Sequence, residues 1–205
     1  MLINKARIAV LVSGGGTNLQ ALIDAQNAGK LRSGEIVFVV SNNKDAFAIQ
    51  RARRAGIETM VITGSQTTFE SALLSTLYRH EIDIIILAGF MKILSPQVIR
   101  EYEGRILNVH PSLIPSFCGE GFYGLKVHQA ALDRGVKVTG ATVHIVNEIP
   151  DGGPILLQRA VEVQPEDTPE TLQRRVMEKA EWILLPQAAE MLSKKIMEEK
   201  ERLYD

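Results

Sequence analysis

Short apolar runs alternate with helical patterns over the first two-thirds of this 205-residue chain. The runs are rich in Val, Ile and Leu, which is typical of strands buried on both faces of a parallel sheet. They cover residues 8–12, 36–40, 57–62, 82–87 and 105–109. This order predicts an α/β fold in which a mostly parallel, twisted sheet carries helices on both faces, with a Rossmann-like N-terminal half.

The alternation changes in the last third of the chain. Residues 138–146 and 155–163 form two further strand patterns, and only a short Pro/Gly-rich bend separates them. Strands joined so closely suit antiparallel pairing, because a parallel pair needs a longer crossover. We therefore expect about seven strands, with an antiparallel extension near the C-terminus and a last helix that runs toward residue 201.

Helix starts are expected where capping residues precede apolar helical patterns. Thr17 with Gln20, and Thr67 with Glu70, have the spacing of a capping box. Thr168 stands before a proline that suits the first helical turn and an acid that suits the helix dipole. These residues predict three helix N-termini.

The composition limits the classes of partner. The chain has 23 basic and 24 acidic side chains, a net charge of −1, so no electrostatic footprint for nucleic acid or an anionic membrane is expected. No apolar run is long enough to span a bilayer. Residues 1–7 lack the apolar region and cleavage site of a signal peptide. We expect a cytoplasmic protein, with monomer and homodimer both open.

The single cysteine, Cys118, excludes an internal disulfide and a multi-cysteine metal site within one chain. No group of His, Cys or carboxylate residues has a zinc-binding spacing, so no metal is expected. The sequence shows no internal repeat, low-complexity linker or break in composition. Residues 1–205 are therefore expected to form a single domain.

A glycine-rich segment joins the first predicted strand to the first helix, with Gly14, Gly15, Gly16, Thr17 and Asn18. Three glycines let the backbone approach a ligand closely, and a helix N-terminus adds free N–H groups and partial positive charge. The pattern is neither the dinucleotide-binding G-x-G-x-x-G nor a P-loop. A phosphate site is favoured, and a plain strand-to-helix turn is the alternative.

Asn108 and His110 lie two residues apart at the end of a predicted strand, so their side chains point the same way. An amide can donate to a developing oxyanion, and an imidazole can move a proton or stabilise charge. Asp151 lies in the bend between the last two strands. Beside His110 it would orient the ring; alone it would be an ordinary turn aspartate.

The sequence gives weaker predictions for Thr142 and for the other three histidines. Thr142 and His144 share one face of a predicted strand. Thr142 could reach the reaction centre through water, whereas His144 is expected to be a supporting or core residue. His80 and His128 fall in helical patterns and are expected at the surface or at helix ends.

Five stretches then stand out together: SGGGTNLQ at 13–20, LAGFMKILS at 87–95, NVHPSL at 108–113, GATVH at 140–144 and DGGP at 151–154. Each alone is weak, but all five in this order resemble the phosphoribosylglycinamide formyltransferases (glycinamide ribonucleotide transformylases). The resemblance covers nearly the whole chain. It implies a mostly parallel seven-stranded sheet, with a phosphate-binding half at about 1–105 and a catalytic and folate-binding half at about 106–205.

The resemblance also implies a reaction. The formyl group of 10-formyltetrahydrofolate, used as a co-substrate, passes to the amine of glycinamide ribonucleotide in purine biosynthesis, without a metal or a covalent enzyme intermediate. By the same resemblance Asn108 and His110 stabilise the oxyanion, His110 handles the proton, and Asp151 sets the charge of His110. The partners are then two small molecules.

The implied binding residues fall in two groups. The ribonucleotide phosphate and amine are expected at the glycine-rich segment and at Glu181. The folate is expected along two segments, with Met91, Lys92, Ile93, Leu94, Asn147, Glu148 and Asp151. Ile93 and Leu94 could serve the core and the pocket together.

Three departures from the family pattern qualify these expectations. The spacing from Arg175 to Glu181 is one residue longer than in the family, so a solvated helix glutamate is the alternative for Glu181. Near Gln66 the family often has a basic residue, and none stands here. The segment 116–124 is longer than the common form and could be a mobile lid, with Cys118 as an inert thiol away from the catalytic set.

Four other functions are less consistent with this sequence. Methionyl-tRNA formyltransferase and formyltetrahydrofolate deformylase share the Asn, His and Asp set, but an added RNA-binding or regulatory domain is expected in them. A non-catalytic nucleotide-binding module would not need all three residues. A nicotinamide oxidoreductase is disfavoured because the third glycine and the acid after the second strand are missing.

Overall fold

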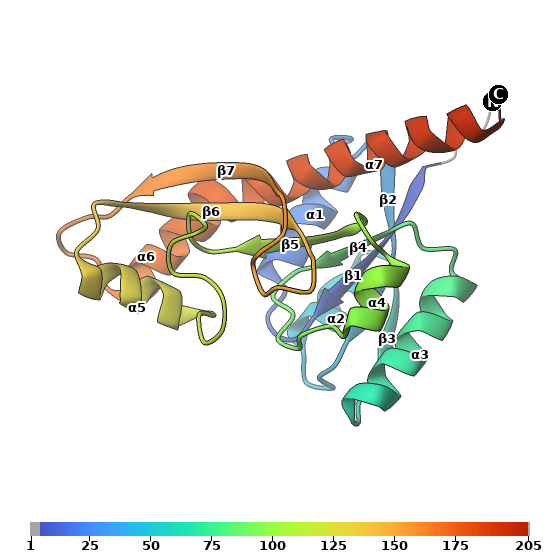
Figure 1. Cartoon of the computed structure of the whole chain (residues 1–205), viewed down its shortest axis with the longest axis horizontal. Coiled ribbons are helices and arrows are strands. Elements are labelled where there is room, and N and C mark those ends of the chain that lie inside the picture. Colours follow the sequence, from blue (N-terminus) through green and yellow to red (C-terminus); the bar gives the residue numbers. More distant parts are fainter. Residues whose placement is uncertain (1–4, 205) are drawn as a thin grey trace.

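The computed structural model describes residues 5–204. The prediction about residues 1–7 therefore falls partly outside the described residues. A seven-stranded sheet runs through the molecule in the order β3-β2-β1-β4-β5-β6-β7 (Figure 1). The strands are β1 (Ala6–Val12), β2 (Gly34–Ser41), β3 (Glu58–Val61), β4 (Ile84–Leu87), β5 (Ile106–His110), β6 (Val138–Ile145) and β7 (Ile155–Glu162).

The direction of the strands changes once along the sheet. The strands from β3 to β5 are all parallel, whereas β6 is antiparallel to β5 and β7 is antiparallel to β6. This arrangement confirms the predicted mostly parallel sheet with an antiparallel extension. The strand order reverses between β1 and β4, and open α/β sheets bind ligands outside the carboxyl ends of strands at such a point.

Helices cover both faces of the sheet (Figure 1). They are α1 (Thr17–Asn27), α2 (Phe47–Arg54), α3 (Gln66–Arg79), α4 (Pro96–Glu101), α5 (Leu125–Arg134), α6 (Pro169–Val176), the π-helix η1 (Met177–Glu181) and α7 (Trp182–Tyr204). Side chains of α1, α2, α6 and α7 join one hydrophobic cluster, and those of α3 and α4 join a second. No helix within residues 5–204 is long and apolar enough to cross a membrane.

The central strand β1 shows why its apolar run is continuous. Ile8, Val10 and Val12 belong to the first hydrophobic cluster, and Ala9 and Leu11 belong to the second. Successive side chains of a strand point to opposite faces. Both faces are covered by helices, so both must be apolar.

The predicted capping boxes at Thr17 and Thr67 are wrong. Gly16, with φ 74°, is the residue before α1, and its left-handed conformation already places Thr17 inside the helix. Helix α3 begins one residue before Thr67, and the Ser65 side chain accepts from the Thr68 N–H instead. Thr168 does cap α6, with Thr171 rather than an acid as its reciprocal partner.

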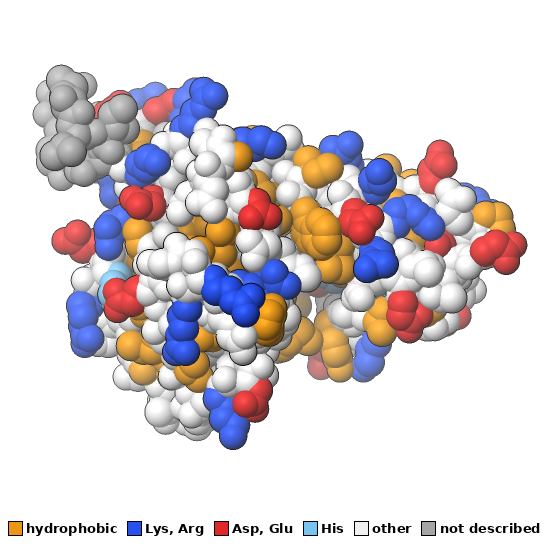
Figure 2. Space-filling model, turned by 180° about the vertical axis from the view of Figure 1, so that it is seen from behind, with side chains coloured by type: hydrophobic (Ala, Val, Ile, Leu, Met, Phe, Trp, Pro, Cys, Tyr) orange, Lys and Arg blue, Asp and Glu red, His pale blue; other side chains and the backbone are white. Residues whose placement is uncertain are grey.

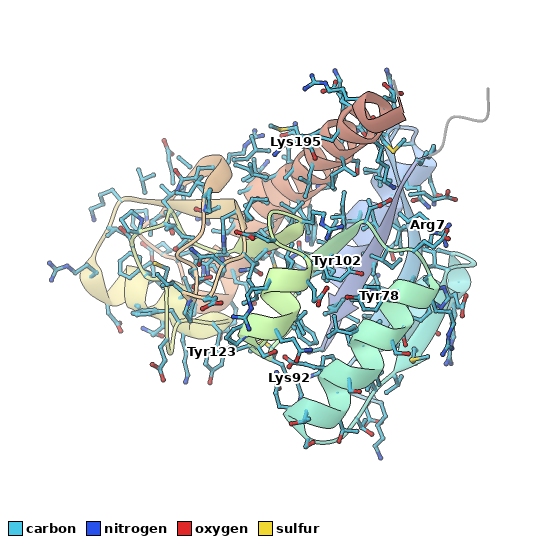
Figure 3. The ribbon with its side chains drawn as sticks, turned by 45° about the vertical axis from the view of Figure 1, so that its right-hand side comes forward. Arg7, Tyr78, Lys92, Tyr102, Tyr123 and Lys195 are labelled. Carbon is cyan, nitrogen blue, oxygen red and sulfur yellow. The ribbon has the colours of Figure 1, made fainter. Side chains whose placement is uncertain are left out.

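The second face is held by tyrosines between α3 and α4. Figure 3 labels Tyr78 on α3 and Tyr102 at the end of α4. The Tyr78 hydroxyl donates to the Glu101 carboxylate. Burial raises the pKa of Tyr102 to about 12. The neutral Tyr78 hydroxyl therefore ties α3 to the last residue of α4, while neutral Tyr102 packs in the second hydrophobic cluster.

Candidate active site

The glycine-rich segment is tied down from behind. Its three successive carbonyls accept hydrogen bonds from the layer beneath: Ser13 O from Asn43 Nδ2 at 3.1 Å, Gly14 O from the Ala48 N–H at 3.0 Å and Gly15 O from Arg51 Nε at 2.8 Å. In a trans peptide the C=O and the following N–H point in opposite directions. The N–H groups of Gly14, Gly15 and Gly16 are thus turned toward the open side, ahead of the α1 N-terminus.

The three glycines are needed for different reasons. Gly16 has φ 74°, and a Cβ built on it would lie 2.6 Å from the Ala48 Cβ, so the fold itself requires glycine there. A Cβ on Gly14 or Gly15 would meet nothing within 4 Å, and neither has a positive φ. Packing does not explain glycine at these two exposed positions. A Cβ at either position would instead extend into open space.

Glu181 lies beside this segment. The Asn18 Nδ2 donates to Glu181 Oε2 at 2.7 Å, and the Glu181 residue is only 6% exposed. Burial raises the pKa of Glu181 to about 7, although the Asn18 hydrogen bond lowers it. The alternative of a solvated helix glutamate is wrong. The π-helical turn Met177–Glu181 holds one more residue than an α-helical turn would, which accounts for the longer spacing before Glu181.

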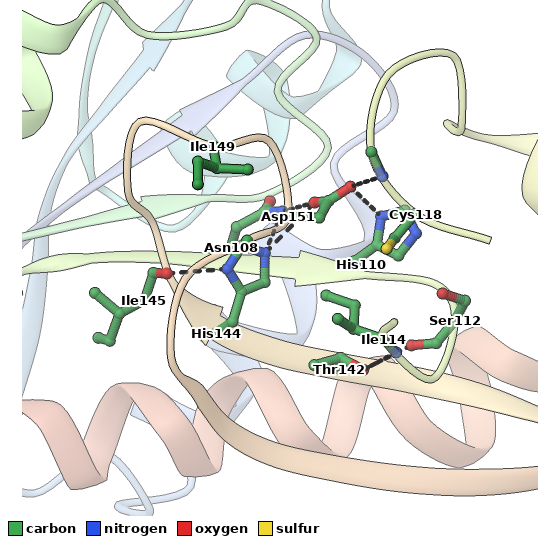
Figure 4. Close-up of polar contacts among 12 residues, drawn as sticks. Asn108, His110, Ser112, Ile114, Cys118, Thr142, His144, Ile145, Ile149 and Asp151 are labelled. Carbon is green, nitrogen blue, oxygen red and sulfur yellow. Dashed lines mark hydrogen bonds and ion pairs between the residues drawn. The ribbon is translucent and has the colours of Figure 1, made fainter. Parts of the chain in front are cut away.

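Asn108, His110 and Asp151 meet at the carboxyl end of β5 (Figure 4). Asn108 Nδ2 lies 3.4 Å from Asp151 Oδ1, and His110 Nδ1 lies 3.4 Å from Asp151 Oδ2. Leu107 and Val109 join the hydrophobic cluster on the opposite face. The alternation along β5 therefore places the amide and the imidazole side by side, as predicted.

The antiparallel partner β6 adds a fourth polar side chain. Asn108 pairs with His144, and His110 pairs with Thr142, across the two strands. His144 Nδ1 donates to the Ile145 carbonyl at 3.0 Å, and its Nε2 lies 3.1 Å from Asn108 Nδ2 and 3.5 Å from Asp151 Oδ1. A neutral His144 accepts from the amide at Nε2, whereas a protonated one donates to the carboxylate. The expectation of a supporting histidine fits this geometry.

Asp151 is held in its ionised form. Burial raises its pKa, but the contact with His144, the hydrogen bond from the Gly119 N–H at 2.9 Å and the positive charge of a protonated His110 outweigh burial, so its pKa lies below the ordinary value. Its φ is 54°, a conformation that aspartate tolerates better than most residues. The site thus contains a carboxylate whose two oxygens face the other polar side chains.

The segment 116–124 folds onto this cluster. The Phe117 carbonyl accepts a hydrogen bond from His110 Nε2 at 2.8 Å. The Gly119 N–H donates to Asp151. Cys118 lies between these two contacts, so its predicted place away from the catalytic set is wrong. Burial, and then the charge of Asp151, raise the pKa of its thiol. A raised pKa disfavours the reactive thiolate, in keeping with the expected inert thiol.

The first expected folate segment lies next to the glycine-rich segment. The Met91 N–H donates to Ser13 Oγ at 2.8 Å. Met91 is 56% exposed and Ile93 is 72% exposed, whereas Leu94 is buried in the core. The expectation that Ile93 also serves the core is wrong. Lys92, labelled in Figure 3, places its Nζ 5.4 Å from the centre of the Phe69 ring.

The second expected folate segment is braced internally. Asn147 Oδ1 accepts from the Ile149 N–H at 3.0 Å, and Asn147 Nδ2 donates to the Gly152 carbonyl at 3.3 Å. Glu148 forms an exposed ion pair with Arg100 at 3.1 Å. These contacts shape the turn that carries Asp151.

The structure also locates His128 and Thr142, two residues with weaker predictions. His128 is fully buried on α5, so its predicted surface position is wrong. Burial, and then the charge of a protonated His110, lower its pKa to about 4. Thr142 accepts from the Ile114 N–H and donates to the Ser112 carbonyl, so it holds the segment after β5. His128 is buried because α5 packs on α6. The spacing of apolar residues within α5 does not indicate that packing.

A groove lies elsewhere, between α1 and α7. Its volume is about 820 Å³, and its lining includes Thr17, Trp182 and Arg51 but none of the residues at the end of β5.

Figure 2 shows basic and acidic side chains interspersed over the back of the molecule. Among residues 5–204, no group of three His, Cys, Asp or Glu side chains is arranged to hold a metal ion.

Comparison with known proteins identifies the family. A model of the formyl transferase family matches residues 6–188. The chain belongs to the formyl transferase family. The chain is 45% identical to a phosphoribosylglycinamide formyltransferase structure from Brucella melitensis, with a TM-score of 0.84 over 93% of this chain and 96% of that one.

Two further relatives define the limits of the match. The chain is 46% identical to a trifunctional purine biosynthetic protein of Gallus gallus over 93% of its own length, but it spans only 19% of that relative. It is 28% identical to a formyltetrahydrofolate deformylase structure from Pseudomonas syringae pv. tomato, with a TM-score of 0.81 over 93% of this chain and 62% of that one. The predicted family and fold are confirmed.

Proposed function

We propose that this chain transfers the formyl group of 10-formyltetrahydrofolate to the amine of 5-phosphoribosylglycinamide, giving formylglycinamide ribonucleotide and tetrahydrofolate in purine biosynthesis. The convergence of Asn108, His110 and Asp151 carries the proposal. Acyl transfer needs donors where negative charge develops and a group that moves a proton. Strands β1, β4 and β5 end at one edge of the sheet, so the glycine-rich segment lies at the same edge as this cluster.

The chemistry follows from these groups. The substrate amine attacks the formyl carbon, and the carbonyl electron pair moves onto oxygen. Asn108 Nδ2 and His110 donate to this oxyanion. The intermediate collapses as the bond between the formyl carbon and the folate nitrogen breaks. The proton lost by the amine passes to the leaving nitrogen through His110 and water, with Asp151 stabilising the charged imidazole.

Each of the two substrates is assigned to residues from both halves of the chain. The N–H groups of residues 14–18 meet the phosphate, and Glu181 contacts the ribonucleotide. The folate lies along residues 91–94 and 147–151, where Met91 and Ile93 expose apolar surface suited to a flat ring. Segment 116–124 must then open, because the Phe117 carbonyl occupies His110 Nε2 in this structure.

A direct assay tests the proposal. Purified protein is mixed with glycinamide ribonucleotide and 10-formyltetrahydrofolate, and folate absorbance is followed. The proposal expects turnover that needs both substrates, and His110→Ala should abolish it while ribonucleotide binding persists. The absence of turnover with folded wild-type protein would overturn the assignment.

Other outcomes identify the competing functions. Release of tetrahydrofolate without the ribonucleotide would identify a hydrolase, in keeping with the similarity to a deformylase structure. Unchanged function in the His110 variant would identify a non-catalytic binding module. The cytoplasmic location, the lack of a metal requirement, the single-domain organisation and the oligomeric state stay predictions.

A further inference from the structure

Arg51 is a charged side chain that the proposed reaction does not use, although it touches the glycine-rich segment. It lies on α2, and its Nε donates to the Gly15 carbonyl at 2.8 Å. Its Nη1 donates to Gln20 Oε1 at 3.1 Å, and its guanidinium lies 5.0 Å from the centre of the Phe47 ring. Two hydrogen bonds and an aromatic face therefore lock the guanidinium behind the segment.

The hydrogen bond to Gly15 has a directional consequence. The Gly15 carbonyl and the Gly16 N–H belong to one peptide plane and point in opposite directions. By holding that carbonyl on the α2 side, Arg51 turns the Gly16 N–H toward the open side. Gly16 is itself in the left-handed conformation, and successive N–H groups around such a residue form an anion-binding concavity.

The guanidinium of Arg51 faces the Phe47 ring, but no carboxylate within residues 5–204 forms an ion pair with it. Segment 64–68 offers no second cation, because its residues are all uncharged; the Gln66 amide donates to Glu70 and to the Ile93 carbonyl. A positive charge one peptide away from the proposed phosphate site is therefore available.

We propose that Arg51 is the positioning residue of the phosphate site: it aims the Gly16 N–H and supplies the positive charge that selects a phosphorylated acceptor. The inference rests on the proposed function, in which these N–H groups meet the phosphate. This role of Arg51 explains how a chain with a net charge of −1 could bind the phosphate dianion of the ribonucleotide without a basic patch. Arg51 acts through the segment rather than by touching the reacting atoms.

The helix offers a matched control. Arg54 lies one turn later on α2, and its guanidinium is 5.8 Å from the same Phe47 ring. No hydrogen bond joins it to the described glycine-rich segment. Arg54→Gln therefore removes the same charge from the same helix and leaves the Gly15 peptide untouched.

The test compares Arg51→Gln, Arg51→Lys and Arg54→Gln. Arg51→Gln should raise the KM for the ribonucleotide roughly 10- to 100-fold, with the KM for folate and kcat unchanged. Arg51→Lys should fall between it and wild type, and Arg54→Gln should match wild type. Wild-type KM in both Arg51 variants overturns the proposal. If Arg51→Gln fails to fold, Arg51→Lys is the deciding variant. An unchanged KM for the ribonucleotide in Arg51→Lys then overturns the proposal.

A second measurement separates this inference from the proposed function. Inorganic phosphate binding is followed by ³¹P titration without folate, so it does not depend on formyl transfer. Loss of phosphate affinity in Arg51→Gln supports the role of Arg51 even if the protein fails to transfer a formyl group. Equal weakening for the ribonucleotide and for its dephosphorylated riboside would show a merely structural role and overturn the inference.

Discussion

The Asn18 amide donates a 2.7 Å hydrogen bond to Glu181, tying the first turn of α1 to a π-helical turn 163 residues later. The carboxylate is almost fully buried, and its hydrogen-bond donor, Asn18, is the last residue of the glycine-rich segment. Two distant parts of the sequence thus form one wall of the proposed ribonucleotide site. The burial that positions Glu181 also changes its proton affinity.

This burial makes stability depend on pH. The folded pKa of about 7 exceeds the ordinary 4.5, so the folded state holds the proton more tightly than the unfolded chain. The contribution of Glu181 to stability is full below pH 4.5 and is lost as pH rises to about 7. Glu181→Gln should therefore gain stability relative to wild type above pH 7, on the order of 1–3 kcal/mol. Thermal unfolding from pH 4 to 9 measures this.

Glu178 supplies the control for that experiment. It lies in the same π-helical turn but is half exposed, so Glu178→Gln should leave the pH dependence unchanged. A Glu181→Gln stability difference that does not vary with pH would contradict the buried, proton-holding carboxylate.

The glycine positions should separate folding from binding. Gly16→Ala forces an L-residue to φ 74° and brings its Cβ against Ala48, so it should cost about 1–3 kcal/mol of stability. Gly15→Ala meets no protein atom and should change stability by less than about 0.5 kcal/mol. It should nevertheless raise the ribonucleotide KM, because the new methyl group occupies the space left for the ligand. Denaturant unfolding and steady-state kinetics give both quantities, and an unchanged KM in a stable Gly15 variant would refute the ligand role.

Buried His128 should weaken the fold in acid. Its folded pKa of about 4 lies below the ordinary 6.5, so the unfolded chain binds the proton more readily. Stability therefore falls as pH drops from 6.5 toward 4. Both ring nitrogens lack a hydrogen-bond partner among the described residues. His128→Leu should gain roughly 2 kcal/mol relative to wild type at pH 5 and much less at pH 8. Urea midpoints at the two pH values check this, and a pH-independent difference would contradict it.

Cys118 should be silent in catalysis despite its position. Its thiol pKa is raised above the ordinary 9.0 by burial and by the nearby Asp151 charge, so little thiolate exists at pH 7. Cys118→Ser should keep kcat within about twofold, since the thiol donates only to the Pro115 carbonyl and a serine hydroxyl can do the same. Alkylation of the wild-type thiol should be slower than that of an unfolded control, and faster alkylation would show an activated cysteine.

Much of the fold could be predicted from local pattern. The continuous apolar run of β1 identified a strand covered on both faces, and the alternation along β5 placed Asn108 beside His110. Both inferences depend only on the two-residue period of a strand. The capping boxes at Thr17 and Thr67 failed because a left-handed glycine and a nearby serine occupied the cap positions instead.

The contacts that support the site could be predicted only in part. The sequence predicts a supporting or core role for His144, but its partners, and the surroundings of Arg51 and buried His128, depend on neighbours that the spacing of their own segments does not indicate. Strand register sets His144 opposite Asn108, and helix packing sets Arg51 behind Gly15. Such contacts depend on the relative placement of elements, which is decided by side-chain packing across the whole core.

The sequence alone determined the order of strands and helices, the glycine-rich segment and the family, because these depend on local periodicity and on motifs that are contiguous in the chain. Tertiary structure decided which side chains meet and how deeply they are buried. It placed Asp151 against His110, Glu181 against Asn18 and segment 116–124 over the imidazole. Burial and charge act between neighbours in space, so the ionisation of these groups emerges only when the sheet and its two helical layers have packed.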